Sequence, residues 1–268
     1  MLAGPEEEIS LMTGSLRALL AGLVDYAGLF PPASLEMPAA LRNYAAYRTG
    51  PHAWALGRFV VPAARFDEVD AAFPCSVIGR PARMVDSCEL KVDRASDVPA
   101  PPPGVVAYYE LPIAEDPAPL AGTGARAKVR TGGLTPDAFP TSDLLARFIA
   151  RCAHARVPFK ATAGLHHPLR SEHRCTYAQD SPKALMHGFV NVFLAAALLW
   201  CGGSEKDAIA TLEEERPVAF RFDEDSVAWH AQRLTTDELR ASREQFAISF
   251  GSCSFDEPME DLQQLGWL

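Results

Sequence analysis

Short strand-like segments recur along the whole chain, and many of them are separated by helical patterns. We count eight, near residues 23, 55, 75, 87, 104, 125, 157 and 217. Strands that alternate with helices favour a parallel sheet, and eight such units are what a (β/α)8 barrel of the TIM type requires. With 268 residues and no internal repeat or linker, the chain is predicted to form a single catalytic domain over residues 1–268, in which residues 1–15 are a flexible N-terminal segment.

The distribution of helices predicts an irregular barrel. Apolar spacing and capping residues indicate helices over residues 37–47, 63–73, 144–155, 186–200, 204–215 and 235–246, the last opened by a capping box of Thr235 and Glu238. The connections between the third and fourth strands and between the fifth and sixth are poor in helical pattern. Residues 217–223 are expected to form the eighth strand, and residues 250–268 a loop and a short helix.

One lysine lies in a strand-like segment that leads into a polar turn. Lys160 and Thr162 are two residues apart, so an extended strand points both side chains to one side. Gly164 allows a sharp turn after the strand, and His166 and His167 follow it. The alternative for an isolated lysine at a strand end is a solvated or salt-bridged side chain.

Charged residues fall on a single face of several predicted strands. They are Glu89, Lys91 and Asp93, then Glu110, then Lys128 and Arg130, and finally Lys160. Strands of an ordinary parallel sheet are apolar on both faces, so a charged face indicates one that points into a barrel, whose carboxyl end holds the active site in barrel enzymes. Buried charges are costly unless they pair or meet a ligand. We therefore expect an interleaved network of carboxylates and cations.

These side chains suggest a reaction at a carbonyl group. Arg130 and the amides of Gly132 and Gly133 suit a carboxylate or a phosphate, because a guanidinium fork and free N–H groups match oxyanions. Lys160, crowded by Lys128 and Arg130, is expected to have a lowered pKa, because like charges and burial both disfavour the ammonium. A neutral amine can attack a carbonyl carbon and form a Schiff base.

Other residues complete the predicted site. His166 or His167 would shuttle protons, and Glu110 would act as a second acid or base. The remaining substrate-binding candidates are Lys91, Lys128, Thr162, Asp25, His187 and Asn191. The predicted function is that of a lyase for carbon–carbon or carbon–oxygen bonds that acts on a small anionic carbonyl compound and needs no cofactor.

A local resemblance points to the same chemistry. The order Lys-x-Thr-x-Gly at Lys160, Thr162 and Gly164 resembles the Schiff-base strand of the class I deoxyribose-phosphate aldolases. Residues 128–133, KVRTGG, are similar to a neighbouring strand of that family, which follows the Schiff-base strand there and precedes it here. The resemblance implies an aldolase-type lyase with Lys160 as the amine.

A second resemblance covers nearly the whole chain. The phrases DYAGLFPPA, RFVVP, VRTGG, FKATAGLHHP, HGFVNVF and FGSCSF resemble those of an uncharacterised bacterial family. This resemblance implies that the segments belong together, and it implies no particular chemistry.

Two alternatives stay open. The first is a divalent transition metal held by His166, His187 and Glu110, with Asp25 or Cys253 as further ligands, because these groups suit zinc, iron or manganese. The second is a non-catalytic binding protein, for which an apolar interior at the barrel mouth would be expected. Thiols such as Cys253 could also act as nucleophiles with a nearby histidine, but the cysteines have no defining spacing, and this favours small buried hydrophobic residues.

The overall charge limits the partners. A net charge of -9 and a pI near 5.3 argue against a nucleic-acid or anionic membrane surface, because both need a basic field. We expect a small anionic metabolite as the partner. Trp267 and Leu268 suggest a docked terminus or an interface in a homo-oligomer.

The expected compartment is the cytoplasm. Three consecutive glutamates at residues 6–8 stand where a secretory signal needs basic and then apolar residues. The longest apolar run, residues 188–200, is too short to span a bilayer. The six cysteines show no paired framework, which is typical of free thiols in a reducing compartment.

Overall fold

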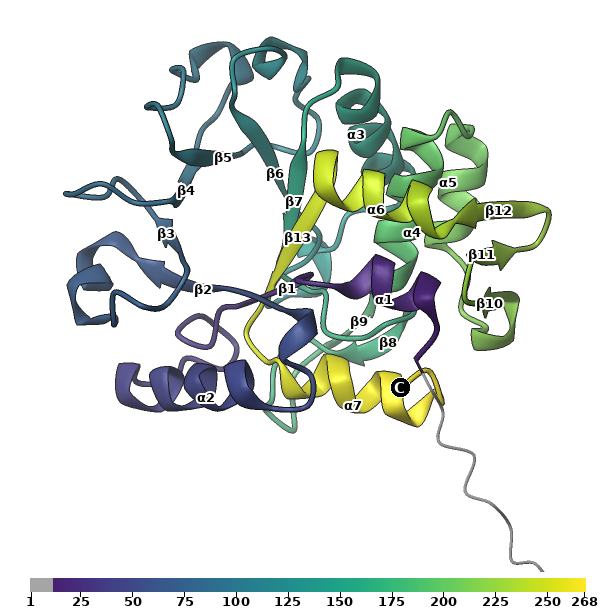
Figure 1. The fold of residues 1–268 in the computed structure, drawn as a ribbon, viewed down its shortest axis with the longest axis horizontal. Helices are drawn as coiled ribbons and strands as arrows, with labels where there is room; N and C mark the ends of the chain where they lie inside the picture. Colours follow the sequence, from purple (N-terminus) through teal and green to yellow (C-terminus); the bar gives the residue numbers. More distant parts are fainter. Residues whose placement is uncertain (1–11) are drawn as a thin grey trace, which may run out of the picture.

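In the computed structural model, which describes residues 12–268, eight parallel strands close into a barrel (Figure 1). The strands are β1 (Val24–Tyr26), β2 (Leu56–Pro62), β3 (Cys75–Ile78), β4 (Ser87–Lys91), β5 (Val106–Glu110), β6 (Arg126–Arg130), β7 (Phe159–Thr162) and β13 (Ala247–Ser252). Each of the first seven pairs with the next along the chain, and β13 lies between β7 and β1. The predicted (β/α)8 barrel of the TIM type is therefore confirmed.

The eighth barrel strand is not the segment that the sequence predicted. Residues 217–223 contain β10 (Phe220–Phe222), the edge of a three-stranded antiparallel sheet with β11 (Ser226–Trp229) and β12 (Gln232–Thr235). Strand β13 instead follows directly on helix α6 (Thr236–Gln245), partly in residues that we expected to form a loop. Gly251 and Ser252 give this strand few of the branched or aromatic side chains by which strands are recognised.

Helices cover the barrel unevenly. The chain forms α1 (Gly14–Leu20), α2 (Met37–Thr49), α3 (Ser142–Ala155), α4 (Phe189–Trp200), α5 (Glu205–Leu212), α6 and α7 (Asp256–Gln264). Helices α3 to α6 gather on the side of β6, β7 and β13, and α2 lies by β2, whereas the side of β3 to β5 carries only short connections (Figure 1). The predicted scarcity of helix between the third and fourth and between the fifth and sixth strands is confirmed.

One predicted helix is wrong. Residues 63–73 form a 3-10 helix only over Ala63–Glu68. Asp70 then accepts a hydrogen bond from the Ala72 N–H at 2.8 Å, which makes a tight turn shortly before Pro74. An aspartate that bonds to the backbone two residues on competes with the helix, and the segment ends early.

Helix α4 builds the largest part of the core on the covered side. Its residues from Phe189 to Leu199 are all buried, and it packs against α3, α5 and α6. Phe189 also stacks on Phe250 of β13, with ring centroids 5.3 Å apart. Within residues 12–268, no helix is long and apolar enough to cross a membrane.

Two segments flank the carboxyl end of the barrel. The polar stretch after β7 forms an antiparallel hairpin of β8 (Ser171–Arg174) and β9 (Lys183–Met186), whose connecting residues Thr176 and Tyr177 line the cavity described below. Helix α7 follows β13 and brings Glu257 to the same cavity. Both segments therefore contribute to the candidate site.

The predicted N-terminal segment falls partly outside the described residues, because residues 1–11 are not among them. Residues 14 and 15 were wrongly included in it. They belong to α1, where Ser15 is buried and its hydroxyl donates a hydrogen bond of 2.5 Å to the Asp223 carbonyl. The capping box predicted at Thr235 and Glu238 is present at the start of α6.

Candidate active site

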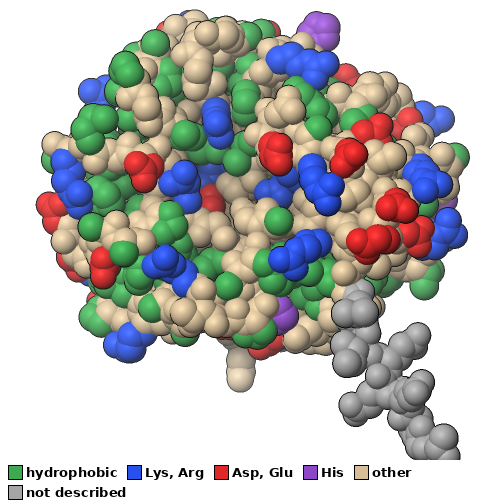
Figure 2. Space-filling model, in the orientation of Figure 1, with side chains coloured by type: hydrophobic (Ala, Val, Ile, Leu, Met, Phe, Trp, Pro, Cys, Tyr) green, Lys and Arg blue, Asp and Glu red, His purple; other side chains and the backbone are tan. Residues whose placement is uncertain are grey.

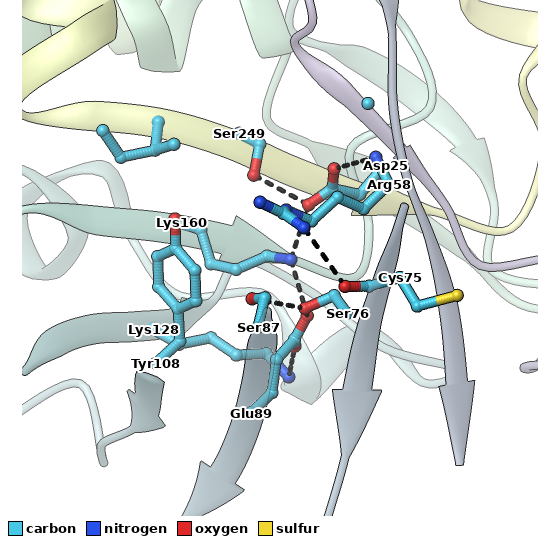
Figure 3. Close-up of polar contacts among 12 residues, drawn as sticks. Asp25, Arg58, Cys75, Ser76, Ser87, Glu89, Tyr108, Lys128, Lys160 and Ser249 are labelled. Carbon is cyan, nitrogen blue, oxygen red and sulfur yellow. Dashed lines mark hydrogen bonds and ion pairs between the residues drawn. The ribbon is translucent and has the colours of Figure 1, made fainter. Parts of the chain in front are cut away.

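Lys160 of β7 points into the barrel and is almost completely buried, with 1% of its surface exposed. Its neighbours Phe159 and Ala161 face the opposite way and belong to the apolar core, as the alternation of a strand requires. The Lys160 Nζ lies 2.7 Å from Asp25 Oδ2 and 2.6 Å from Glu89 Oε1 (Figure 3). The lysine therefore sits between two carboxylates from β1 and β4.

Glu89 links this lysine to a second one. Its Oε2 lies 2.8 Å from Lys128 Nζ, while its Oε1 also accepts a hydrogen bond of 2.7 Å from the Ser76 hydroxyl (Figure 3). Lys128 and Lys160 are direct register partners on β6 and β7, so two like charges stand side by side. Glu89 bridges both ammonium groups, and this bridge compensates the repulsion between them.

The charges continue toward the mouth of the barrel. Lys128 Nζ contacts Glu110 Oε2 at 2.8 Å, and the Arg130 guanidinium approaches Glu110 Oε1 at 3.6 Å. The result is an alternating series, here called the charge series, of Asp25, Lys160, Glu89, Lys128, Glu110 and Arg130. Exposure rises along it from 1% for the Lys160 side chain to 53% for that of Arg130. The predicted interleaving of carboxylates and cations is therefore present.

Asp25 anchors the buried end of the charge series. Its Oδ2 accepts a hydrogen bond of 2.8 Å from the Ser249 hydroxyl of β13, and its Oδ1 accepts one of 2.7 Å from the Arg58 backbone N–H of β2. A Cβ at Gly57 would lie 2.3 Å from Asp25 Oδ1, so only glycine leaves room for the carboxylate here. These contacts fix the orientation of Asp25 toward Lys160.

The charge series shifts the pKa values of two of its members, Lys160 and Glu89, in opposite directions. Burial disfavours the ammonium of Lys160, but Asp25 and Glu89 outweigh that effect and hold the pKa of Lys160 well above its usual range. Burial likewise disfavours ionised Glu89, but Lys160 and Lys128 hold the pKa of Glu89 well below its usual range. The expected lowering of the pKa of Lys160 is therefore wrong, because the sequence did not reveal how closely the two carboxylates approach it.

A cavity of about 680 Å³ opens above the charge series at the carboxyl end of the barrel. Of the residues predicted for the site, its wall contains Lys160, His166, His167, Glu110, Arg130, Lys128, Gly133, Thr162 and Lys91. Asp25 lies behind Lys160. Gly132 also lies behind the wall, packed so closely that a Cβ there would be 2.9 Å from Gly164 Cα. The volume suits a small molecule.

The two adjacent histidines are each held by a carboxylate of helix α7. His166 Nδ1 lies 2.8 Å from Glu257 Oε2, and His167 Nδ1 lies 2.6 Å from Asp261 Oδ2. The His167 ring also stacks on that of His173, with centroids 3.4 Å apart. Both histidines face the cavity, and α7 determines how their rings are oriented.

His187 and Asn191 do not line the cavity, contrary to prediction. The His187 Nε2 lies 2.8 Å from the Pro140 carbonyl oxygen. The Asn191 amide donates to two backbone carbonyls of the α5 end and accepts from the Arg170 N–H. Both side chains satisfy backbone groups around the start of α4, which is a structural role.

The alternative metal site is not assembled. In the part of the chain from residue 12 onward, no group of three or more His, Cys, Asp or Glu side chains is arranged to hold a metal ion. The proposed ligands His166, His187 and Glu110 have other partners, namely Glu257, the Pro140 carbonyl and Lys128. The described residues therefore do not fit the metal that the alternative required.

Several residues of the cavity were missed by sequence reasoning. Glu257 and Tyr177 lie in the wall, and Ser76 and Ser249 hold the carboxylates of the charge series. For Cys253 the sequence favoured a small buried hydrophobic residue over a metal ligand or a nucleophile, yet its side chain lines the cavity. The spacing of Glu257 and Asp261, one helical turn apart, could have indicated two carboxylates on one face of α7, because residues four apart share a helix face.

On the face shown in Figure 2, Lys and Arg side chains are interspersed with Asp and Glu.

A comparison of the chain with protein-family models, with curated proteins and with solved structures finds no match. The resemblances to the class I deoxyribose-phosphate aldolases and to an uncharacterised bacterial family therefore stay predictions. The fold itself is a TIM-type barrel, an architecture that commonly carries enzymes with active sites at the carboxyl end of the strands.

Proposed function

We propose that this protein is a lyase that acts on a small anionic carbonyl compound through a Schiff base on Lys160. The observation that carries the proposal is the position of the Lys160 amine in the wall of the cavity, within 2.7 Å of two carboxylates that can take and return protons. The charged wall also favours an enzyme over the alternative of a non-catalytic binding protein, for which an apolar interior was expected.

The raised pKa of Lys160 defines the first step. The resting ammonium must give a proton to Asp25 or Glu89 before its nitrogen can attack the carbonyl carbon. A nitrogen–carbon bond then forms. Of the three ammonium protons, two leave with the carbonyl oxygen as water, and one stays on the nitrogen of the protonated imine. The two carboxylates are close enough to relay these protons.

The protonated imine accounts for a lyase reaction. Its positive nitrogen accepts the electron pair of the carbon–carbon bond one atom away from the imine carbon, so that this bond breaks and an enamine forms. The departing fragment loses its hydroxyl proton and becomes a carbonyl compound. Protonation of the enamine carbon and hydrolysis of the imine by water then release the second product and regenerate Lys160. Glu110, 2.8 Å from Lys128, supplies a further carboxyl group to move the proton of the departing fragment. His166 and His167 face the same cavity and can act in the same way.

The cavity mouth suits an anionic group on the substrate. Arg130 and Lys91 both line the cavity, and Arg130 is only loosely engaged by Glu110, at 3.6 Å. A carboxylate or phosphate that binds the free edge of the guanidinium would extend the charge series by one anion. The carbonyl group of the same small molecule could then reach Lys160.

Borohydride trapping tests the proposal. Sodium borohydride reduces a protonated imine to a stable secondary amine, so the protein is treated with pyruvate or with glyceraldehyde 3-phosphate and borohydride and then mapped by mass spectrometry. We expect one adduct, on Lys160, formed faster as the pH rises, because the raised pKa leaves more free amine only at alkaline pH. Adducts spread over exposed lysines such as Lys183, or absent with both compounds, would contradict the proposal.

Arg130 provides a test of anion binding. The substitution Arg130→Ala is expected to raise the pyruvate concentration for half-maximal trapping roughly 10-fold or more, the scale of one lost hydrogen bond to a charged group. Arg147→Ala, at an exposed arginine of α3, serves as the matched control and should leave that concentration unchanged. An equal response of the two variants would remove Arg130 from the anion site.

A further inference from the structure

A second group of reactive side chains lines the same cavity, apart from the charge series. Cys253 follows the last residue of β13, and its Sγ lies 3.9 Å from His166 Nε2. The other ring nitrogen of His166, Nδ1, is held at 2.8 Å by Glu257 Oε2. The Tyr177 hydroxyl lies 3.6 Å from the same sulfur. All four side chains belong to the wall of the cavity.

The fold brings these groups together from three separate connections. Strands β7 and β13 are parallel neighbours, so the residues that follow them, which include His166 and Cys253, emerge side by side. Helix α7 starts at Asp256 and places Glu257 behind the imidazole, while the β8–β9 hairpin places Tyr177 over the thiol. A thiol, an imidazole and a carboxylate in this order are the arrangement that activates a nucleophile.

The electrostatic environment favours a charged imidazole beside the sulfur of Cys253. Burial disfavours charge on His166, but its hydrogen bonds with Cys253 and Glu257 raise the pKa of His166 to about 9. Burial also disfavours ionised Glu257, but the hydrogen bond to His166 keeps the pKa of Glu257 below its ordinary value. The carboxylate therefore holds a charged imidazole against the sulfur.

We propose that Cys253, His166 and Glu257 form an acyl-transfer centre in which the Cys253 thiol attacks the carbonyl carbon of an ester or thioester. The sulfur–carbon bond forms, and the bond from that carbon to the leaving oxygen or sulfur breaks. The thiol proton has moved to His166 Nε2 before the attack, which gives the charged imidazole, and it then passes from Nε2 to the leaving group. Water, activated by the same imidazole, then releases the acyl group as a carboxylic acid and regenerates the thiol.

Glu257 acts in this centre as a positioning residue. It accepts a hydrogen bond from Nδ1 of His166 and so directs Nε2 toward the thiol. Tyr177 is placed to donate its hydroxyl proton in a hydrogen bond to the sulfur or to the oxyanion of the addition intermediate. The cations Arg130 and Lys91 in the same wall favour an acyl group that carries a negative charge.

The test uses the whole protein and 4-nitrophenyl acetate as the probe. We expect a burst of one equivalent of 4-nitrophenolate and an added acetyl group on Cys253, found by peptide mapping. The burst should be absent in Cys253→Ala and about 100-fold slower in His166→Gln, the scale of lost general acid–base catalysis. Cys201→Ala is the control, because Cys201 is exposed and does not line this cavity, and it should keep the full burst. Thermal unfolding of each variant checks that it is folded.

The positioning role of Glu257 has its own readout. The rate of alkylation of Cys253 by iodoacetamide is followed against pH, and Glu257→Gln is expected to move its midpoint. The other titratable groups that face this centre include Tyr177, His167, His173, Asp261 and Tyr26, and they are unchanged in the variant. Acetylation of Cys201 in preference to Cys253, a burst that survives Cys253→Ala, or an unchanged rate in His166→Gln would overturn the proposal.

Discussion

Replacement of Lys160 by methionine is expected to lower the free energy of unfolding by about 3–5 kcal/mol, the usual result of removing one partner of a buried ion pair. Methionine retains most of the apolar stem of lysine but not its charge. Asp25 and Glu89 would then lose a cation at 2.7 and 2.6 Å in a site almost without solvent. Urea unfolding at neutral pH measures the difference.

Two further variants distinguish the charge effect from lost packing. In Asp25→Asn combined with Lys160→Met, both charges of one pair are removed, so the loss of stability should be smaller than the sum of the single losses. Lys183→Met makes the same change at an exposed lysine that pairs with Glu172 at 2.8 Å, and it should cost no more than about 1 kcal/mol. Equal losses of unfolding free energy for Lys160→Met and Lys183→Met would contradict the prediction, because they would show that the buried lysine charge contributes no more to stability than an exposed one.

Acid should destabilise the protein through Glu89. Because Lys160 and Lys128 hold its pKa in the folded state below the ordinary value near 4.5, its contribution to stability is present above pH 4.5 and is lost as the pH falls below that value. Between pH 4.5 and 2.5, wild-type protein should lose on the order of 2 kcal/mol more than Glu89→Gln, which cannot titrate at this position. The variant should be the less stable of the two at pH 7. Denaturant unfolding at a series of pH values measures both curves.

A matched exposed glutamate serves as the control for this prediction. Glu68 pairs with Arg65 at the surface, so Glu68→Gln should keep the steep acid loss of the wild type. If Glu89→Gln instead follows the wild-type curve over the whole range, then the acid sensitivity arises elsewhere and Glu89 is not held ionised by the two lysines.

Most of the barrel could be predicted from the sequence, because local pattern determines where a strand forms. Seven of the eight strands begin close to the predicted positions. The eighth was misplaced because residues 217–223 alternate as a strand should, whereas Ala247–Ser252 contains small residues and is separated from a capped helix by Phe246 alone. The eighth strand must pair with both β7 and β1 to close the barrel, and local sequence patterns do not show which segment does so.

The site could be predicted only in part, for a related reason. The alternation of each strand shows that Lys160, Lys128 and Glu110 share the interior, and the cavity wall contains all three. Distances across the barrel are not encoded in any single strand. Asp25 of β1 and Glu89 of β4 therefore contact Lys160 although neither strand is adjacent to β7. Their charges raise the pKa of Lys160, whereas the sequence predicted that it would be lowered.

The sequence raised Cys253 as a nucleophile beside a histidine only as a less favoured interpretation, because no spacing in the chain shows which histidine lies near it. Cys253 and His166 are 87 residues apart, and Tyr177 comes from a hairpin that the sequence suggested only as a polar excursion. Each of these residues has an ordinary local explanation, as a packed thiol, a loop histidine or a surface tyrosine. Only closure of the barrel by β13 and the position of α7 place them against one another.

The crystal structure of the protein reduced with borohydride in the presence of pyruvate tests the central claim most directly. We expect continuous electron density from Lys160 Nζ into the cavity, with the carboxylate of the trapped compound directed toward Arg130. Density that ends at an unmodified Lys160, still between Asp25 and Glu89 while another lysine carries the adduct, would contradict it.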